Sequence, residues 1–232
     1  MGLDRFVSLV MKRVRGREEG ISPGIKSTEA LSNMLQKGAM AYLRGLCVKP
    51  FLGAARGSFF LGRGVTILNK RKLRLGAGVY IGNYSYLDCL SVSGVTLGHS
   101  VTIREGCWLQ LTSSYAHPGA SITIGNNVYI GPRMTLGAAA PIVIGNRCQF
   151  GANISLVAEN HKYAGEGDIF AQGTTRQGIL IGDDVWVGNG AIILDGVTIG
   201  DGVVIGAGTV VTKSIPSRSV VVGVPGRVIK TR

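Results

Sequence analysis

Between Ile181 and Lys213 the sequence places an aliphatic residue at every sixth position. These residues are Ile181, Val187, Ile193, Ile199, Ile205 and Val211. The unit around them, IGDDVWVG and IGDGVVIG, recurs upstream as LGAGVYIG, LGHSVTIR, IGNNVYIG and IGNRCQFG, which begin at Leu75, Leu97, Ile124 and Ile144, with a partial LGRGVTIL at Leu61. One short unit written repeatedly indicates a solenoid, in which each repeat packs on the next, rather than a globular sheet.

Each unit fits a very short strand followed by a sharp corner. In Val185-Trp186-Val187 the two-residue period of a strand directs both valines inward and Trp186 outward. The Gly, Asn and Asp residues between strands supply the left-handed backbone conformations that corners need. Ile181 and Ile199 are separated by three six-residue units, which fits three strands and three corners in each turn. The sequence predicts a prism of three parallel sheets with about 4.8 Å between coils, and the usual crossover rule does not favour a left-handed winding.

Longer spacings between the repeats predict loops that leave the prism. The steps from Leu75 to Leu97, from Leu97 to Ile124 and from Ile124 to Ile144 all exceed the three units of a regular turn. The step from Ile144 to Ile181 is about twice as long as a regular turn, and its surplus lies at about 159–178. Loops on a rigid scaffold are where function concentrates, so this segment is the first place to search for a site.

Composition limits the partners of the chain. A formal net charge of +12 indicates an anionic partner such as a nucleotide-like cofactor, a nucleic acid or an acidic membrane surface. The repeats lack aromatic platforms interleaved with a basic groove, so we expect no nucleic acid. No apolar run reaches the roughly 18 residues that span a bilayer, and no signal peptide opens the sequence, so we expect a cytoplasmic protein.

The segments outside the repeats divide the chain into three parts. Residues 1–57 form a basic arm and a helical segment, 58–216 the β-helix, and 217–232 a tail. Residues 1–17 could lie on the inner face of the cell membrane, or form a solvated arm or a packed helix. Further on, Thr28 is a candidate N-cap of a helix that precedes Pro50. Its apolar residues are expected to pack: Leu31, Met34, Leu35, Tyr42, Leu43 and Leu46.

From about Leu61 onward the sequence resembles the hexapeptide-repeat acyltransferases, whose fold is a left-handed parallel β-helix. The resemblance is strongest in IGDDVWVG and in VIGAGTVVTKSIPSRSVVVGVPGRVIK, which look like the cofactor end of the maltose, galactoside and bacterial polysaccharide O-acetyltransferases. It implies an all-β solenoid with an N-terminal helical segment, a homotrimer, and acetyl-CoA as a co-substrate in a groove between adjacent prisms.

The same resemblance implies which residues contact acetyl-CoA. Trp186 would border the pantetheine arm, with Asn189 and Ala207 along it, Thr212 and Lys213 at the nucleotide end, and Arg227 and Lys230 at the phosphates. The spacing agrees in part, since Asn189 and Ala207 are one regular turn apart and hence stacked. Trp186 could instead pack at a subunit interface, and the basic residues could be a solvated tail.

Acyl transfer from a thioester to a hydroxyl needs a base, and an imidazole titrates in the right range. His161 opens the longest loop, and its surroundings, Asn160-His161, Gln172-Gly173 and Gly178-Ile179, resemble the catalytic histidine segment of the polysaccharide-type enzymes. Glu159, Asn160 or a backbone carbonyl could orient His161. His117 and Tyr163 are candidates for the acceptor pocket, although His117 could be a plain surface residue. His99 fits a structural role at a corner.

We expect no metal site. The four cysteines lack zinc spacing, and Cys107 and Cys148 share the inward phase, so they are expected to be reduced, apolar filling. Some β-helix proteins of this shape hydrate carbon dioxide with zinc held by histidines. His99 and His117 are spaced by one regular turn, but the surplus residues between Leu97 and Ile124 disturb their stacking.

Three functions remain in competition. The first is an O-acetyltransferase that modifies a sugar hydroxyl, in a surface polysaccharide precursor. A xenobiotic or antibiotic acetyltransferase of the same fold is the alternative within that class. The third is a non-enzymatic β-helix scaffold, for which Asn160-His161, an outward Trp186 and a basic tail would have no use.

Overall fold

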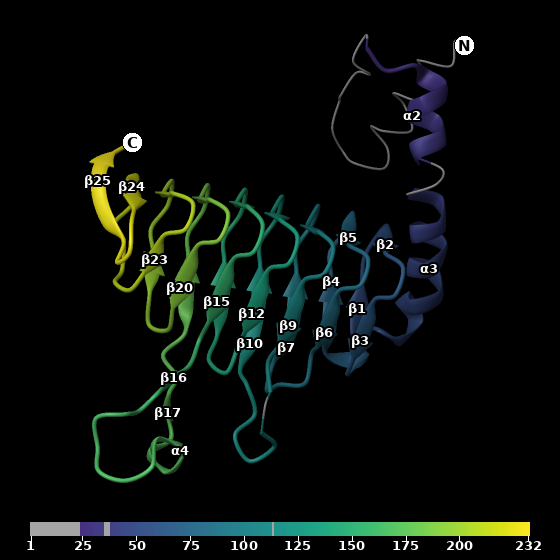
Figure 1. Cartoon of the computed structure of the whole chain (residues 1–232). Coiled ribbons are helices and arrows are strands. Elements are labelled where there is room, and N and C mark those ends of the chain that lie inside the picture. The colour runs from purple at the N-terminus through teal and green to yellow at the C-terminus, as the bar shows by residue number, and fades with distance from the viewer. Residues whose placement is uncertain (1–23, 35–37, 113) are drawn as a thin grey trace.

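The computed structural model describes residues 24–34, 38–112 and 114–232, and over residues 54–231 it is a prism of three sheets (Figure 1). Sheet A contains β1 (Ala54–Ala55), β4 (Leu73–Leu75), β7 (Gly94–Leu97), β10 (Ser121–Ile124), β13 (Ile142–Ile144), β18 (Ile179–Ile181) and β21 (Thr198–Ile199). Sheet B contains β2 (Phe59–Leu61), β5 (Val79–Ile81), β8 (Thr102–Ile103), β11 (Tyr129–Ile130), β14 (Gln149–Phe150), β19 (Trp186–Val187), β22 (Val204–Ile205), β24 (Ser219–Val222) and β25 (Arg227–Thr231). Sheet C contains β3 (Thr66–Leu68), β6 (Tyr86–Asp88), β9 (Trp108–Gln110), β12 (Thr135–Gly137), β15 (Ser155–Val157), β20 (Ile192–Leu194) and β23 (Val210–Val211). The chain visits the sheets in the order A, B, C, so we name the three edges of the prism the AB, BC and CA corners.

The strand register confirms the alignment of the repeats. In sheet A, Leu75 pairs with Leu97, and Leu97 with Ile124, although both steps are longer than a regular turn. The longest step, from Ile144 to Ile181, closes in register as well, and so does the regular step from Ile181 to Ile199. Surplus residues therefore leave the prism without shifting any strand. The fold is a parallel β-helix.

The interior is an aliphatic column, as the alternation of the strands predicts. Val185 and Val187 are buried, whereas the Trp186 side chain between them is 54% exposed. Cys89, Cys107 and Cys148 lie in the same buried cluster as the aliphatic residues, which confirms that Cys107 and Cys148 are inward filling. Burial raises the pKa of the Cys89 thiol to about 12 and that of Cys148 to about 11. At neutral pH these thiols are protonated and chemically inert.

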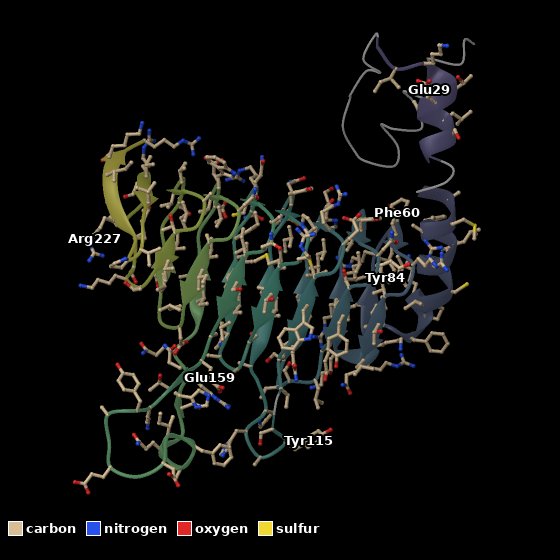
Figure 2. The ribbon with its side chains drawn as sticks, viewed as in Figure 1. Glu29, Phe60, Tyr84, Tyr115, Glu159 and Arg227 are labelled. Carbon is tan, nitrogen blue, oxygen red and sulfur yellow. The ribbon has the colours of Figure 1, made fainter. Side chains whose placement is uncertain are left out.

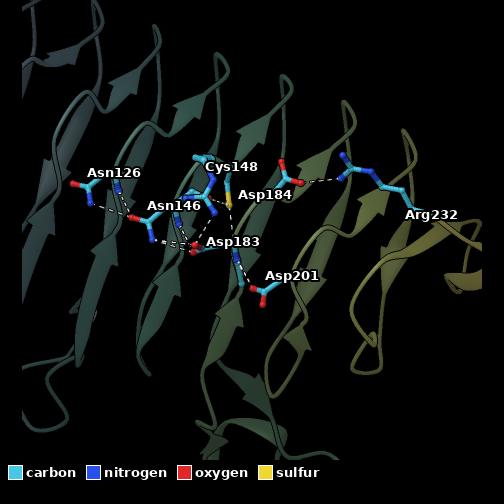
Figure 3. Close-up of polar contacts among 9 residues, drawn as sticks. Asn126, Asn146, Cys148, Asp183, Asp184, Asp201 and Arg232 are labelled. Carbon is cyan, nitrogen blue, oxygen red and sulfur yellow. Dashed lines mark hydrogen bonds and ion pairs between the residues drawn. The ribbon is translucent and has the colours of Figure 1, made fainter. Parts of the chain in front are cut away.

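A ladder of side-chain amides and carboxylates runs along the AB corner (Figure 3). The backbone N–H of Asn126 donates to Asn146 Oδ1 at 2.8 Å, that of Asn146 to Asp183 Oδ1 at 2.7 Å, and that of Asp183 to Asp201 Oδ1 at 2.7 Å. Each corner N–H has no partner within its own coil, so the next coil supplies one. His99 takes part in the same pattern. Its Nδ1 accepts the Ala77 N–H at 3.1 Å, which confirms its structural role.

The helical segment closes the first end of sheet B. It consists of α2 (Ser27–Met34), α3 (Met40–Val48) and the 3-10 turn η2 (Lys49–Phe51). A second 3-10 turn, η3 (Lys70–Lys72), follows β3 in the first coil of the prism. The Arg44 Nε of α3 donates to the Leu61 carbonyl of β2 at 2.8 Å, and a Cβ at Gly45 would overlap the Phe59 carbonyl oxygen. This close approach covers the edge strand β2, whose backbone groups would otherwise be open to pairing.

Two expectations about this segment are wrong. Of the side chains expected to pack, Leu43 is 53% and Leu46 43% exposed, because α3 meets β2 through its smallest residues, Ala41 and Gly45. The Tyr42 ring does pack, with its centroid 5.5 Å from that of Phe60. Leu35 and the Met34 side chain lie outside the described part of the chain. Thr28 lies inside the first turn of α2, which begins at Ser27, and so is not the N-cap. The proposed amphipathic helix at 1–17 lies outside the described residues.

An antiparallel hairpin closes the other end. β24 continues sheet B in parallel with β22, and β25 turns back and pairs antiparallel with β24. Arg232 Nη1 then binds Asp184 Oδ2 at 3.1 Å, which fastens the end of the chain to the AB corner. None of the helices among the described residues is both long enough and apolar enough to cross a membrane.

Candidate active site

Both long insertions leave the prism at one edge, the CA corner. One follows β9 and returns to sheet A at β10, and the other, residues 158–178, follows β15 and returns at β18. In Figure 1 the two loops hang from the same edge of the prism, and Figure 2 shows Tyr115 on the shorter loop and Glu159 at the root of the longer one. An insertion between two sheets leaves every strand in register, so this corner can carry loops at no cost to the core.

The longer loop has a structure of its own. β16 (Asn160–His161) pairs antiparallel with β17 (Thr174–Thr175), so His161 lies opposite Thr174. Beyond this ribbon the short α4 (Ile169–Gln172) forms the tip. The Gln172 side chain holds the tip together, since its Oε1 accepts the Gly165 N–H at 2.9 Å and its Nε2 donates to the Gly165 and Gly167 carbonyls at 3.0 and 3.1 Å. His161 therefore stands exposed on a short but ordered ribbon.

Two side chains that sequence reasoning missed fasten this loop to the prism. Asp195, 8% exposed at the next CA corner, accepts the Gln177 N–H with both oxygens at 3.0 Å and the Gly178 N–H with Oδ1 at 2.7 Å. Arg176 binds Glu159 Oε2 through Nε at 2.6 Å and the His117 carbonyl through Nη1 at 3.1 Å. The periodic pattern gave no signal for Arg176, because it lies in the aperiodic loop.

The candidate catalytic and acceptor residues therefore gather at one corner. Glu159, Asn160, His161 and Tyr163 lie on the long loop, and Arg176 joins Glu159 to the His117 backbone of the short loop. Tyr163 is 78% exposed. The Glu159 carboxylate faces Arg176, and Asn160 contributes its carbonyl oxygen to a 3.4 Å hydrogen bond from Thr175 Oγ1.

The candidate acetyl-CoA residues are spread over sheet B, the BC corner and the CA corner near the C-terminal end. Trp186 lies on sheet B between Gln149 and Val204, and the same outward column ends in Val220 and Lys230. Arg227 begins β25 on the edge of that sheet. Thr212 and Lys213 follow β23 and are exposed at the CA corner.

Asn189 and Ala207 are stacked at the BC corner, as their spacing predicts. The Gly208 N–H donates to the Asn189 carbonyl at 2.8 Å, and Ala207 lies directly against the Gly188 backbone. Asn189 Oδ1 also accepts the Ala152 N–H at 2.7 Å. The side-chain oxygen of Asn189 is thus already committed to the corner. Its contribution to a ligand would come from its remaining polar groups.

One chain brings Thr212 and Lys213 to the same CA corner as the long loop, but it does not bring Trp186 there. Trp186 lies on sheet B, whereas His161 extends from the corner where sheets C and A meet. The width of a sheet separates sheet B from that corner on either route around the prism. A ligand in contact with both Trp186 and His161 would therefore have to lie between two prisms.

Comparison with known proteins agrees with the repeat pattern. Residues 178–213 match the family described as bacterial transferase hexapeptide (six repeats). The coils over residues 178–213 are therefore hexapeptide repeats. The resemblance to hexapeptide-repeat acetyltransferases is thereby confirmed for this part of the chain.

The chain is similar in sequence to known acetyltransferases and in fold to a solved acyltransferase structure. The chain is 34% identical to a galactoside O-acetyltransferase of Lactococcus lactis subsp. lactis (strain IL1403) over 53% of its length and 59% of that protein. It is 35% identical to the galactoside O-acetyltransferase of Escherichia coli (strain K12) over 56% of its length and 63% of that protein. The chain thus spans less than two thirds of these relatives. The crystal structure of AntD, an N-acyltransferase from Bacillus cereus, superposes with a TM-score of 0.57 at 18% identity, covering 82% of this chain and 88% of AntD, and so has a similar fold.

The described residues contain no group of three or more His, Cys, Asp or Glu side chains that could hold a metal ion. The candidate groups at the CA corner are imidazole, carboxylate, hydroxyl and backbone groups. Among these kinds of group, an imidazole is the one best suited to general-base catalysis, so His161 is the candidate base.

Proposed function

We propose that the protein is an O-acetyltransferase that moves the acetyl group of acetyl-CoA to a sugar hydroxyl, with His161 as the general base. The observation that carries this proposal is the position of His161. It stands exposed on a ribbon that Asp195 and Arg176 fasten to the prism, at the corner where both insertions meet. The similarity to two galactoside O-acetyltransferases supports the reaction and the class of acceptor.

In the proposed reaction His161 removes the proton of the acceptor hydroxyl as its oxygen attacks the thioester carbonyl carbon. A tetrahedral intermediate forms with its charge on the former carbonyl oxygen, which a backbone N–H at a corner can stabilise. The C–S bond then breaks, and His161 returns its proton to the departing CoA sulfur. A positioned base of this kind contributes roughly 10²- to 10⁴-fold to the rate.

We further propose that acetyl-CoA lies between two prisms of a left-handed β-helical homotrimer. Trp186 would then border the pantetheine arm, while Asn189 and Ala207 line it at the BC corner. The exposed cations of the C-terminal end would serve the nucleotide and its phosphates, together with Thr212; these cations are Lys213, Arg227 and Lys230. The separation of Trp186 from His161 within one chain supports a shared site, because a second copy can bring its own His161 to the groove.

The acceptor side would be formed by the two loops. His117 and Tyr163 are proposed to line it, since the contact of Arg176 with the His117 carbonyl holds the short loop beside the long one. Glu159 would act on His161 indirectly, through the ion pair that fixes the root of the ribbon. We propose that the acceptor is a precursor of a surface polysaccharide, modified in the cytoplasm at the inner face of the membrane.

Calorimetry with acetyl-CoA tests this function without knowledge of the acceptor. The wild type, Lys213→Ala and His161→Ala are titrated at moderate salt. We expect the wild type to bind, Lys213→Ala to bind more weakly and His161→Ala to bind as the wild type does. No binding by the wild type would favour the scaffold alternative. Binding followed by transfer to an antibiotic rather than a sugar in an acceptor panel would favour the xenobiotic enzyme.

A further inference from the structure

The helix that closes the first end of the prism has an apolar outer face. Met40, Leu43 and Leu46 follow one another at three-residue intervals on α3, on the side opposite Ala41 and Gly45. Met40 is 54% exposed, Leu43 53% and Leu46 43%. Phe51, in the turn η2 that follows the helix, is 58% exposed. Because α3 lies across the end of the prism in Figure 1, this face looks away from the sheets.

Cations predominate at this end among the residues that the structure describes there, although Asp88 of the next coil accepts the Asn69 side-chain N–H with Oδ1 at 2.8 Å. From residue 30 to residue 87 the sequence contains nine Lys and Arg residues and no Asp or Glu. The first coil carries a cation at every corner: Arg56 at the AB corner, Arg63 at the BC corner, and Lys70 and Arg71 at the CA corner. Arg56, Arg63 and Arg71 are exposed, and the ion pairs found among the described residues involve no residue between 38 and 87.

Two of the lysines donate to neutral backbone carbonyls, contacts that leave their positive charge in place. Lys49 Nζ donates to the Gly57 carbonyl at 2.7 Å, and Lys72 Nζ donates to the Ser91 and Val92 carbonyls at 2.9 and 3.0 Å. At this end of the prism, positively charged side chains therefore surround the exposed apolar side chains of α3. A surface with both features matches an anionic lipid bilayer, in which the apolar side chains enter the headgroup boundary and the cations meet lipid phosphates.

Charge and side-chain chemistry argue against other occupants. A second copy of the same end would bring its own uncompensated cations against this face, and like charges at close range repel. Single-stranded nucleic acid binds best to aromatic stacking platforms, whereas four of the six large exposed apolar side chains between residues 40 and 74 are not aromatic.

We propose that the end of the prism formed by α3, η2 and the corners of the first coil docks on an anionic membrane surface. The prism then stands with its C-terminal end away from the lipid. The proposal depends on residues 40–74 and is independent of the transferase activity.

Vesicle sedimentation with the full chain tests the proposal. The probes are phosphatidylcholine vesicles with and without phosphatidylglycerol. We expect the wild type to bind the anionic vesicles and to lose binding as salt is added. Leu43→Ser with Leu46→Ser should weaken binding about tenfold or more, since each buried methylene contributes to partition. Arg56→Gln with Arg63→Gln should weaken it too. The matched controls, Phe170→Ser on the long loop and Arg133→Gln at the middle of the prism, should bind as the wild type does.

A fluorophore on Cys47 gives a second readout. Cys47 is the exposed thiol of α3, one helical turn from Leu43, so an environment-sensitive label there should shift to the blue on anionic vesicles and stay unchanged on phosphatidylcholine alone. Unchanged vesicle binding by both double variants would overturn the proposal and assign any binding to another part of the chain. So would a change of oligomeric mass in Leu43→Ser with Leu46→Ser without a change in vesicle binding, because it would identify this face as a protein contact.

Discussion

Arg176 Nε lies 2.6 Å from Glu159 Oε2, so the strand that leaves the prism and the strand that returns to it are joined at the root of the long loop. Both side chains are largely buried, with 26% and 21% of their surfaces exposed, which makes this a stronger contact than a solvated surface pair. The same guanidinium reaches the His117 carbonyl and so fixes the second loop as well.

The first prediction concerns this ion pair. Arg176→Gln and Glu159→Gln should each lower kcat/KM for the acceptor, because the ribbon that carries His161 loses its anchor. The double variant should be little worse than either single one, with a coupling of about 0.5–3 kcal/mol in the activation free energy. Steady-state kinetics of the four proteins give this cycle. Arg147→Gln, which breaks an ion pair with Asp183 at the AB corner, is the matched control and should keep full activity. Additive losses would show that the pair does not act as a unit.

His161→Ala should lower kcat by roughly 10²- to 10⁴-fold, which is the range expected for the loss of a general base. Acetyl-CoA affinity should stay the same, because His161 is proposed to act on the acceptor hydroxyl and is none of the proposed cofactor contacts. Single-turnover assays with a sugar acceptor measure the first quantity and calorimetry the second. A variant that keeps most of the wild-type kcat would remove His161 from the mechanism.

Subunit mixing tests whether the active site is shared. Trp186→Ala and His161→Ala should each be weakly active alone. When the two chains are co-expressed, each mixed trimer should contain one site with an intact Trp186 and an intact His161, and activity should rise well above that of either parent. If activity does not recover, each site is contained within one chain.

Thiol reactivity should separate Cys47 from the other three cysteines. Cys47 is exposed, whereas burial raises the pKa of Cys89 to about 12 and that of Cys148 to about 11, and raises the pKa of Cys107. A chromogenic disulfide reagent at mildly alkaline pH should therefore titrate one thiol per native chain and all four in denaturant. Rapid reaction of a second native thiol would contradict the buried arrangement.

Acid stability should depend on Asp183. Its pKa is lowered from the ordinary value of 3.8, first by the Asn146 N–H and also by the Asn146 side chain and Arg147. A lowered pKa in the folded state stabilises the fold above the unfolded pKa, and this contribution is lost as the pH falls through the folded value. Asp183→Asn should therefore be less stable than the wild type near neutral pH, and the difference should shrink as the pH falls below the ordinary pKa. Urea unfolding of both proteins, near neutral pH and below the ordinary pKa, measures this difference in the free energy of unfolding. A difference that does not change with pH would contradict the lowered pKa of Asp183.

The sequence was sufficient for the prism and for its register, because a fixed period leaves one way to stack the coils. The outward Trp186, the stacked Asn189 and Ala207, and the long loop at 159–178 all follow from that period. The partners of Glu159 and the anchoring role of Asp195 did not follow, since insertions have no period and their contacts form across distant segments. For α3 the hydrophobic pattern predicted the wrong buried face. The helix packs through Ala41 and Gly45, and Leu43 and Leu46 are exposed.

The helix α3 and the hairpin β24–β25, which close the two ends of sheet B, affect how molecules of this protein meet one another at high concentration. Every internal strand of this sheet is bonded to the coil before and the coil after it, so unsatisfied backbone groups could occur only at its two ends. The helix α3 covers one end, and the hairpin β24–β25 turns the other antiparallel. A chain without either closure would present a parallel strand edge that the opposite end of another molecule could extend. The closures therefore cap both ends of sheet B, and they keep this sheet from being extended by the strands of another molecule.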